Sequence, residues 1–170
     1  MLLISDANIL IDMAVGGLLE VMFLLEETFA VPNVLYEEEL STHHPELLEL
    51  GLLCITLQGQ GVAEAAHLKA QCRGRDAPSQ NDLFALMLAK QEHCPLLTGD
   101  KRLRKLATEH EAEVEVRGTL WVIGRLVESG LVTADEAAEA YLRMRQSGSR
   151  LPWAEVERQL AGWGVELGGQ

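Results

Sequence analysis

The sequence predicts an α/β fold with a central parallel sheet of about five strands, flanked by helices and followed by extra C-terminal helices. Three observations support this. Short apolar runs alternate with segments of helical periodicity up to Gly118, turn residues separate many of them, and only helical periodicity follows. Strands that alternate with helices need crossover connections, which favour a parallel sheet with helices on both faces.

The expected strands are short apolar segments. The first is Leu2-Leu3-Ile4, which Asp6 ends. A later one, ending in Leu96-Leu97-Thr98, runs into Gly99. The full expected set is residues 2–5, 28–31, 52–57, 96–98 and 114–116.

The helices between these strands follow from periodicity and from residues that start or stop helices. Gly16-Gly17 divides a helical stretch over 7–25 in two. Pro32 suits the start of a helix over about 33–40, and Ser79 opens another. Two more are expected over 61–72 and 101–110, whereas residues 45–53 show a mixed pattern.

The segment after Gly118 predicts three helices. The first covers 119–128 and ends at Ser129-Gly130. A capping box from Thr133 to Glu136 starts the second, which runs to about Gln146. Pro152 begins the last, at its first turn. We expect residues 1–170 to form a single domain, with an α/β core over 1–118 and a helical extension over 119–170 packed on it.

Length and composition suit a globular chain, since 170 residues with 48% hydrophobic and 24% charged residues can bury a sizeable core. No apolar run reaches the roughly 18 residues that cross a membrane. No basic segment precedes Met1, so we expect no signal peptide and a cytoplasmic location. Cys54, Cys72 and Cys94 form no disulfide or metal-site spacing, and are expected to be small buried hydrophobes in a reducing compartment.

The formal net charge of −12 argues against broad electrostatic binding to nucleic acid, although local charge can still support it. Two basic sets lie beside acidic residues, and each suits either a solvated helix face or a contact to phosphate. One precedes Asp82 and consists of Lys69, Arg73 and Arg75. The other follows Asp100 and consists of Lys101, Arg102, Arg104 and Lys105.

Four acids, Asp6, Glu38, Asp82 and Asp100, lie on four separate segments. Asp6 and Asp100 follow apolar runs, Asp82 lies at an expected helix start, and Glu38 lies within the expected helix over 33–40. In a parallel sheet the carboxyl ends of the strands form the edge at which ligands bind. Carboxylates gathered there repel one another unless a cation is present. A hard divalent ion, Mg²⁺ or Mn²⁺, suits such oxygen ligands, which points to phosphate chemistry.

Each acid also has a purely structural explanation. Asp6 and Asp100 could cap the helices that follow them, and Asp82 lies three residues after Ser79, as in a capping box. Glu38 lies in a run of three glutamates that could simply be solvated. The combination favours a site, because the crossovers that carry the three aspartates share one edge of the sheet.

Four segments resemble, in order, the motifs of PIN-domain nucleases. The first has an Asp followed by a small residue and Asn; the second has a Pro six positions before an acid, which selects Glu38 over Glu37 or Glu39. The third leads into an apolar, alanine-containing helix, and the fourth has a hydroxyl residue and Asp before a basic helix. These segments are Ile4–Asp12, Val31–Glu38, Ser79–Asp82 and Leu97–Leu103.

The tail resembles the C-terminal part of a little-characterised prokaryotic PIN-like family, in Val116–Leu120, Leu126–Leu131 and Leu151-Pro152. Members of that group often carry Gly-Glu in the third motif and paired Asp in the fourth. This chain has Asn81-Asp82 and a single Asp100 before Lys101.

The resemblance implies a metal-dependent ribonuclease, commonly a VapC-like toxin with an antitoxin partner, and possible homodimers. Asp6, Asp82 and Asp100 would hold one or two Mg²⁺ or Mn²⁺ ions, with Glu38 completing the site or orienting water. Asn8, Ser79 and Thr98 could hydrogen-bond the carboxylates, and Lys101, Arg102, Arg104 and Lys105 could contact RNA.

Two alternatives stay open. One is another Mg²⁺-dependent phosphate-hydrolysing enzyme, such as a haloacid-dehalogenase-type phosphatase, although that class needs a second Asp where this chain has Asn8. The other is a PIN-like interaction protein that binds a partner and no longer cuts.

Overall fold

The fold is built around a central sheet. Within the described residues this sheet has five strands, all of them parallel. The computed structural model describes residues 1–75 and 77–168. The strand order is β3-β2-β1-β4-β5. The strands are β1 (Leu2–Ser5), β2 (Thr28–Pro32), β3 (Leu53–Ile55), β4 (Leu96–Leu97) and β5 (Val116–Arg117).

Strand β1 lies at the centre of the sheet. Its Ile4 stands beside Ala30 of β2 on one side and Leu96 of β4 on the other. Leu3 and Ile4 are both fully buried, although their side chains point to opposite faces. A parallel strand covered on both faces is apolar throughout, which explains why the first expected strand had no polar alternation.

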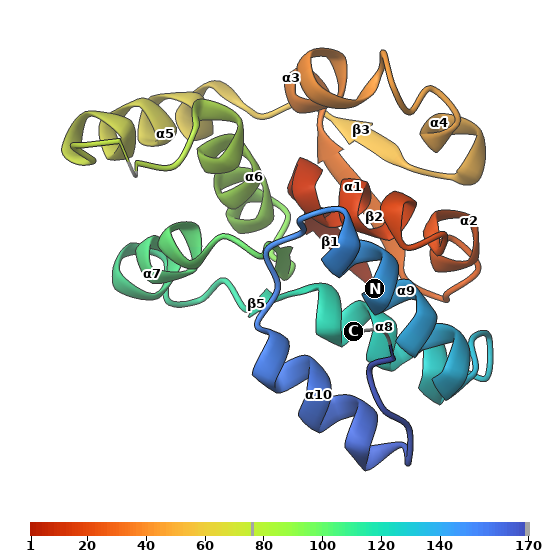
Figure 1. Ribbon diagram of the computed structural model, residues 1–170. Coiled ribbons are helices and arrows are strands. Elements are labelled where there is room, and N and C mark those ends of the chain that lie inside the picture. Colours follow the sequence, from red (N-terminus) through yellow and green to blue (C-terminus); the bar gives the residue numbers. More distant parts are fainter. Residues whose placement is uncertain (76, 169–170) are drawn as a thin grey trace.

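Helix α6 (Gln80–Gln91) packs on β1, β2 and β4. Its residues from Leu83 to Ala89 are all buried. A helix that is apolar all round needs neighbours on several sides. These neighbours are the sheet, α5 (Gly59–Gln71) and α7 (Lys101–His110), and the three helices lie together in Figure 1.

Helices α1 (Ala7–Val15) and α2 (Leu19–Met22) follow β1, and the break between them falls at the predicted glycine pair. Gly17 has φ +73°, a left-handed conformation that favours glycine. A Cβ on Gly16 would lie 2.6 Å from Cε of Met144, so glycine allows α9 (Ala134–Gln146) to approach closely. Arg143 stabilises the same contact, because its Nη2 donates a hydrogen bond to the Gly16 carbonyl oxygen at 2.7 Å.

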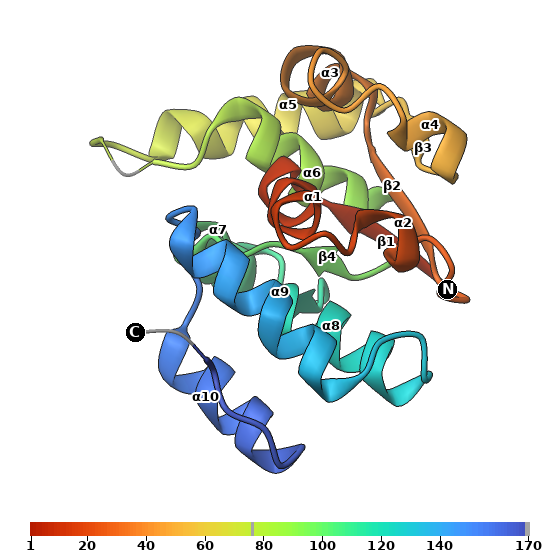
Figure 2. The same cartoon turned by 45° about the vertical axis from the view of Figure 1, so that its right-hand side comes forward.

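The remaining helices are α8 (Thr119–Glu128) and α10 (Trp153–Gly162). α8 and α9 contact α1, and α10 contacts α9. In Figures 1 and 2 the last three helices lie on the side of the molecule away from α5. The predicted helices over 101–110 and 119–128 and the capping box of Thr133 and Glu136 are confirmed. Pro152 precedes α10 as its N-cap instead of lying in the first turn.

The expected single helix over 33–40 is in fact two elements. A short α3 (Asn33–Leu35) runs into a π-helix, η1 (Tyr36–Leu40), in which the Ser41 amide donates to the Tyr36 carbonyl at 2.8 Å. This wider turn holds one residue more than an α-turn, a feature that composition does not reveal. A short helix, α4 (Leu47–Leu50), lies in the segment with the mixed pattern.

The prediction that all three cysteines are buried is wrong. Cys54 is exposed, because β3 is an edge strand with a poorly covered face, and Cys72 and Cys94 are half-buried. Within the described residues, no helix is long and apolar enough to cross a membrane.

Candidate functional site

The predicted acids lie along the edge formed by the carboxyl ends of the strands. Asp6 directly follows β1, and Asp100 follows β4 after a two-residue link. The chain leaves β1 toward β2 on one side, whereas β4 and β5 occupy the other side. Such a reversal of strand order opens a crevice where ligands bind in parallel sheets.

Asp6 is the most buried acid at this edge, with no exposed surface. Its Oδ1 accepts from the Ile9 amide at 3.0 Å, and its Oδ2 accepts from the Thr98 hydroxyl at 2.5 Å. Burial raises the pKa of Asp6 to about 7, the two hydrogen bonds oppose the rise, and the charges of Asp82 and Asp100 add to it. Asp82 and Asp100 are therefore each close enough to Asp6 to repel its charged form.

Thr98 joins Asp6 to Asp100. Its buried hydroxyl donates to Asp6 and accepts from the Asp100 amide at 3.1 Å. Asp100 is the N-cap of α7, with its Oδ1 accepting from the Arg102 amide at 2.8 Å and the Leu103 amide at 3.4 Å. The cap uses one oxygen of this carboxylate and leaves Oδ2 out of it.

Asp82 lies in the capping box that its spacing from Ser79 predicted. The Asp82 amide donates to Ser79 Oγ at 3.1 Å, and the Ser79 amide donates to Asp82 Oδ2 at 3.2 Å. These bonds fix the first turn of α6 and hold Asp82 near Asp6. As in Asp100, one carboxylate oxygen, Oδ1, stays outside the cap.

Glu38 reaches this group from η1. Its Oε2 accepts from the side-chain amide of Asn81 at 2.8 Å, and Asn81 directly precedes Asp82. Glu39 lies at the same place: partial loss of water around its carboxyl raises its pKa, the Asn81 amide opposes the rise, and the charges of Asp82 and Glu38 add to it. Both glutamates therefore lie near the N-terminal turn of α6.

The structure treats the three predicted polar neighbours differently. Thr98 hydrogen-bonds two of the aspartates and Ser79 one. Asn8 is exposed on α1, and within the described residues it hydrogen-bonds none of the four acids. The roles of all three in a reaction stay predictions.

The four predicted RNA contacts lie on α7. Lys101, Arg102, Arg104 and Lys105 are all exposed. Two of them have acidic neighbours, since Arg102 Nε lies 3.5 Å from Asp100 Oδ1 and Lys105 Nζ lies 3.8 Å from Glu109 Oε1. The guanidinium of Arg104 reaches toward Gly118 at the end of β5, where a Cβ on the glycine would lie 3.7 Å from it.

The residues fit a hard divalent cation by donor type and by charge. All are carboxylates, which are the ligands of Mg²⁺ and Mn²⁺, and a bound cation would offset both the burial of Asp6, which is the main cause of its raised pKa, and the smaller repulsion from Asp82 and Asp100. They do not form a finished coordination shell. Across residues 1–75 and 77–168, no three His, Cys, Asp or Glu side chains are arranged closely enough to hold a metal. Asp82 and Asp100 instead cap their helices.

Comparison with protein families adds to this geometry. A family model described as a PIN domain matches residues 2–164, nearly the whole chain. The chain belongs to the PIN-domain family. No curated protein matches it. PIN domains are generally nucleases, so this chain has a nuclease-type fold, and its parallel sheet agrees with the family.

Sequence reasoning missed one side chain in this PIN domain and set another aside. Asn81 was read only as a departure from the expected motif, although an amide beside an acid at a helix start can reach a second acid. Glu39 was set aside because the sequence motif selects Glu38 by its distance of six positions from Pro32. In the structure the charge of Asp82 also acts on Glu39, which follows Glu38 in η1.

Proposed function

We propose that this PIN domain is a metal-dependent endoribonuclease that hydrolyses phosphodiester bonds in RNA. One observation carries the proposal: Asp6 is buried at the carboxyl edge of the sheet, where Asp82 and Asp100 lie near enough for their charges to add to the rise in its pKa that burial causes. Such an arrangement favours a cation from solution, and PIN nucleases typically use divalent metals.

The residues divide the work by position. Asp6, Asp82 and Asp100 would hold Mg²⁺ or Mn²⁺, which supplies positive charge beside the phosphate when bound. Glu38 accepts a hydrogen bond from the neutral side-chain amide of Asn81, and it would accept a proton from the attacking water. As the water oxygen bonds to phosphorus in line and its proton passes to Glu38, the P–O bond to a ribose oxygen breaks and that oxygen takes up a proton from solvent water.

The direct test is cleavage of single-stranded RNA by the purified protein with Mn²⁺, with Mg²⁺ and with excess chelator. We expect cleavage that requires metal and that falls at least about 100-fold in Asp6→Asn, Asp82→Asn and Asp100→Asn. Asp135→Asn, at an exposed helix start on α9, is the matched control and should cut normally. If the wild type cuts no RNA with either metal, or if Asp6→Asn cuts normally, the proposal is wrong.

A second candidate is a PIN-like interaction protein that does not cut. The cap conformations of Asp82 and Asp100 favour it, because both carboxylates already have a structural role. Calorimetric titration with Mn²⁺ separates the two functions. Binding at millimolar Mn²⁺ or below, lost in Asp82→Asn, supports the nuclease, whereas no binding supports the interaction protein.

The proposed biological role is that of a toxin in a toxin–antitoxin pair. A net charge of −12 favours a basic partner, and an antitoxin segment that covers the acidic edge would exclude RNA from it. Adding such a segment should block cleavage. The homodimer and the cytoplasmic location stay predictions.

A further inference from the structure

The N-terminal turn of α6 contains a polar side chain that none of the roles above uses. Asn81 donates its Nδ2 proton to Glu38 Oε2 at 2.8 Å, across 43 positions of sequence. Its own position is fixed, because the capping box of Ser79 and Asp82 surrounds it in the chain. The bond therefore links a rigid helix start to the π-turn that carries the glutamates.

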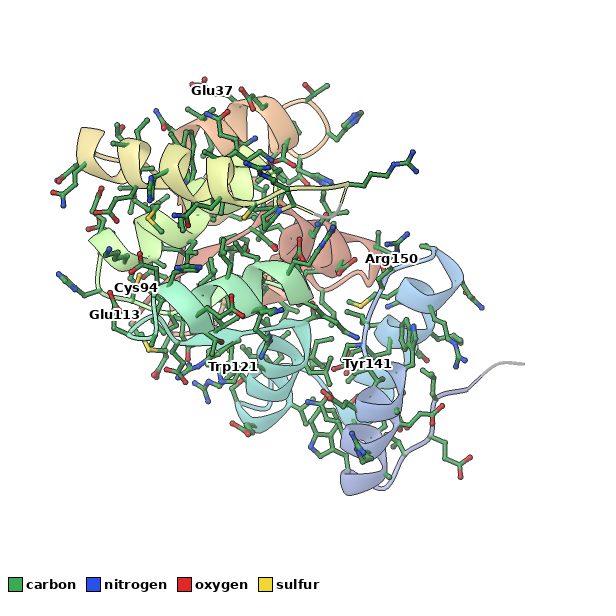
Figure 3. The ribbon with its side chains drawn as sticks, turned by 90° about the vertical axis from the view of Figure 1, so that its left-hand side faces the viewer. Glu37, Cys94, Glu113, Trp121, Tyr141 and Arg150 are labelled. Carbon is green, nitrogen blue, oxygen red and sulfur yellow. The ribbon has the colours of Figure 1, made fainter. Side chains whose placement is uncertain are left out.

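A π-turn is a less regular support than an α-helix, and such turns recur at functional sites. In η1 the chain presents Glu37, Glu38 and Glu39 in succession before Leu40 enters the core. Figure 3 shows Glu37 at the outer margin of the molecule. Its two neighbours instead lie near Asn81 and Asp82.

The chemistry of an amide suits this place. A lysine or arginine would hold Glu38 but would cancel its charge and compete with a metal ion. An amide has two N–H donors and no charge, so it can hold one carboxylate, and lie near a second, without neutralising either. Within the described residues, neither Glu38 nor Glu39 forms a salt bridge with a basic side chain.

We infer that Asn81 is a positioning residue that fixes the Glu38 carboxylate at the acidic edge. The inference rests on the proposed function. In this role Asn81 acts on the reaction only through Glu38.

The first experiment is a double-mutant cycle. Asn81→Ala should lower kcat for RNA about tenfold with KM little changed, and should weaken Mn²⁺ binding in calorimetry by a similar factor. In a Glu38→Gln background the same substitution should have no further effect, because its target is gone. Asn81→Gln, which keeps the amide, should recover part of the loss, and Asn81→Asp should not.

Glu37→Gln, on the same turn as Glu38 but outside the hydrogen bond of Asn81, is the matched control and should leave Mn²⁺ binding unchanged. Equal losses for Asn81→Ala in the wild-type and Glu38→Gln backgrounds would overturn the positioning role and leave only a structural one.

A measurement without metal or activity completes the test. In the apo-protein, the NMR signals of the Asn81 side-chain amide should shift in Glu38→Gln and stay in place in Glu37→Gln. If the Asn81 signals stay in place in both variants, the hydrogen bond is not maintained in solution. The inference then fails, even where the wild type binds Mn²⁺ and cuts RNA. If the wild type does neither, the proposed function fails and this inference with it.

Discussion

Acidic side chains lie at both ends of helix α6, and only at one end does the helix supply a basic side chain to pair with them. At its C-terminal end Lys90 lies between two carboxylates, at 2.8 Å from Glu64 and 3.1 Å from Glu111. At its N-terminal end Asp82 faces Asp6 and Asp100, and the neighbouring amide of Asn81 is neutral. We call these the balanced end and the unbalanced end.

The pKa shifts follow this difference. At the balanced end, the hydrogen bond from Lys90 lowers the pKa of Glu64. At the unbalanced end, burial and then repulsion raise the pKa of Asp6. The same helix can therefore neutralise acids with a lysine, and it does not do so where the parallel strands end. Unbalanced carboxylates at such an edge are the physical argument for an external cation.

The largest expected effect comes from supplying that cation. Mn²⁺ at about 100 times its dissociation constant should stabilise the protein by about 2.7 kcal/mol through mass action. The thermal midpoint, measured by calorimetry, should rise accordingly. Asp82→Asn should remove most of the rise, and Lys90→Met should leave it intact. A rise of equal size in Asp82→Asn would mean that the metal binds elsewhere.

The next effect is the dependence of stability on pH. Asp6 has a folded pKa of about 7 against 3.8 for the ordinary group, so the folded state binds more protons between these values. The contribution of Asp6 to the free energy of unfolding is fully present below pH 3.8 and is lost as the pH rises through about 7. Between pH 5.5 and 7.5 the metal-free protein should lose about 2 kcal/mol from this source.

Chemical denaturation at the two pH values measures this loss. Asp6→Asn cannot ionise at that position, so it should be markedly less sensitive to pH than the wild type. Asp135→Asn is the control and should keep the wild-type dependence. An Asp6→Asn protein with the full pH dependence would assign the effect to other groups, such as Asp12, whose pKa is also raised by burial.

Removing the lysine at the balanced end should lower the free energy of unfolding somewhat less than the pH change does. Lys90→Met leaves Glu111, which is 8% exposed, without its cation, and should destabilise the fold by about 1–2 kcal/mol, since the pair is partly solvated. RNA cleavage should be unchanged. Lys105→Met, whose pair with Glu109 is exposed, is the control and should change the free energy of unfolding little. If a folded Lys90→Met protein lost RNA cleavage, the balanced end of α6 would also affect the reaction at the unbalanced end.

Much of this arrangement could be read from sequence, for local reasons. The Asp6, Asp82 and Asp100 positions were found because helix caps and strand ends depend on residues close in the chain, and those caps are confirmed. The parallel sheet followed from alternating strands and helices. The division into a core over 1–118 and an extension over 119–170 stays a prediction.

What could not be read depends on contacts distant in sequence. The hydrogen bond from Asn81 to Glu38 spans 43 positions of sequence and depends on the π-turn, which no local sequence pattern predicted. The balance at Lys90 joins α6 to Glu64 on α5 and to Glu111 after α7. Cys54 is exposed because β3 is an edge strand, and strand order is a property of the whole sheet.

The smallest expected effect concerns the basic helix beside the unbalanced end. Lys101 and Lys105 lie four residues apart on α7, so they share a face that follows Asp100. If RNA runs along this face, Lys101→Glu with Lys105→Glu should raise KM a few-fold, leave kcat nearly unchanged, and flatten the salt dependence of binding by about 1.4 in log–log slope. Arg158→Glu, on α10, should change neither quantity.

The competing explanation is that Lys105 only pairs with Glu109, an exposed contact of little energy. Fluorescence titration of labelled RNA at several salt concentrations decides between them, because an unchanged slope in the double variant would place the RNA on another face.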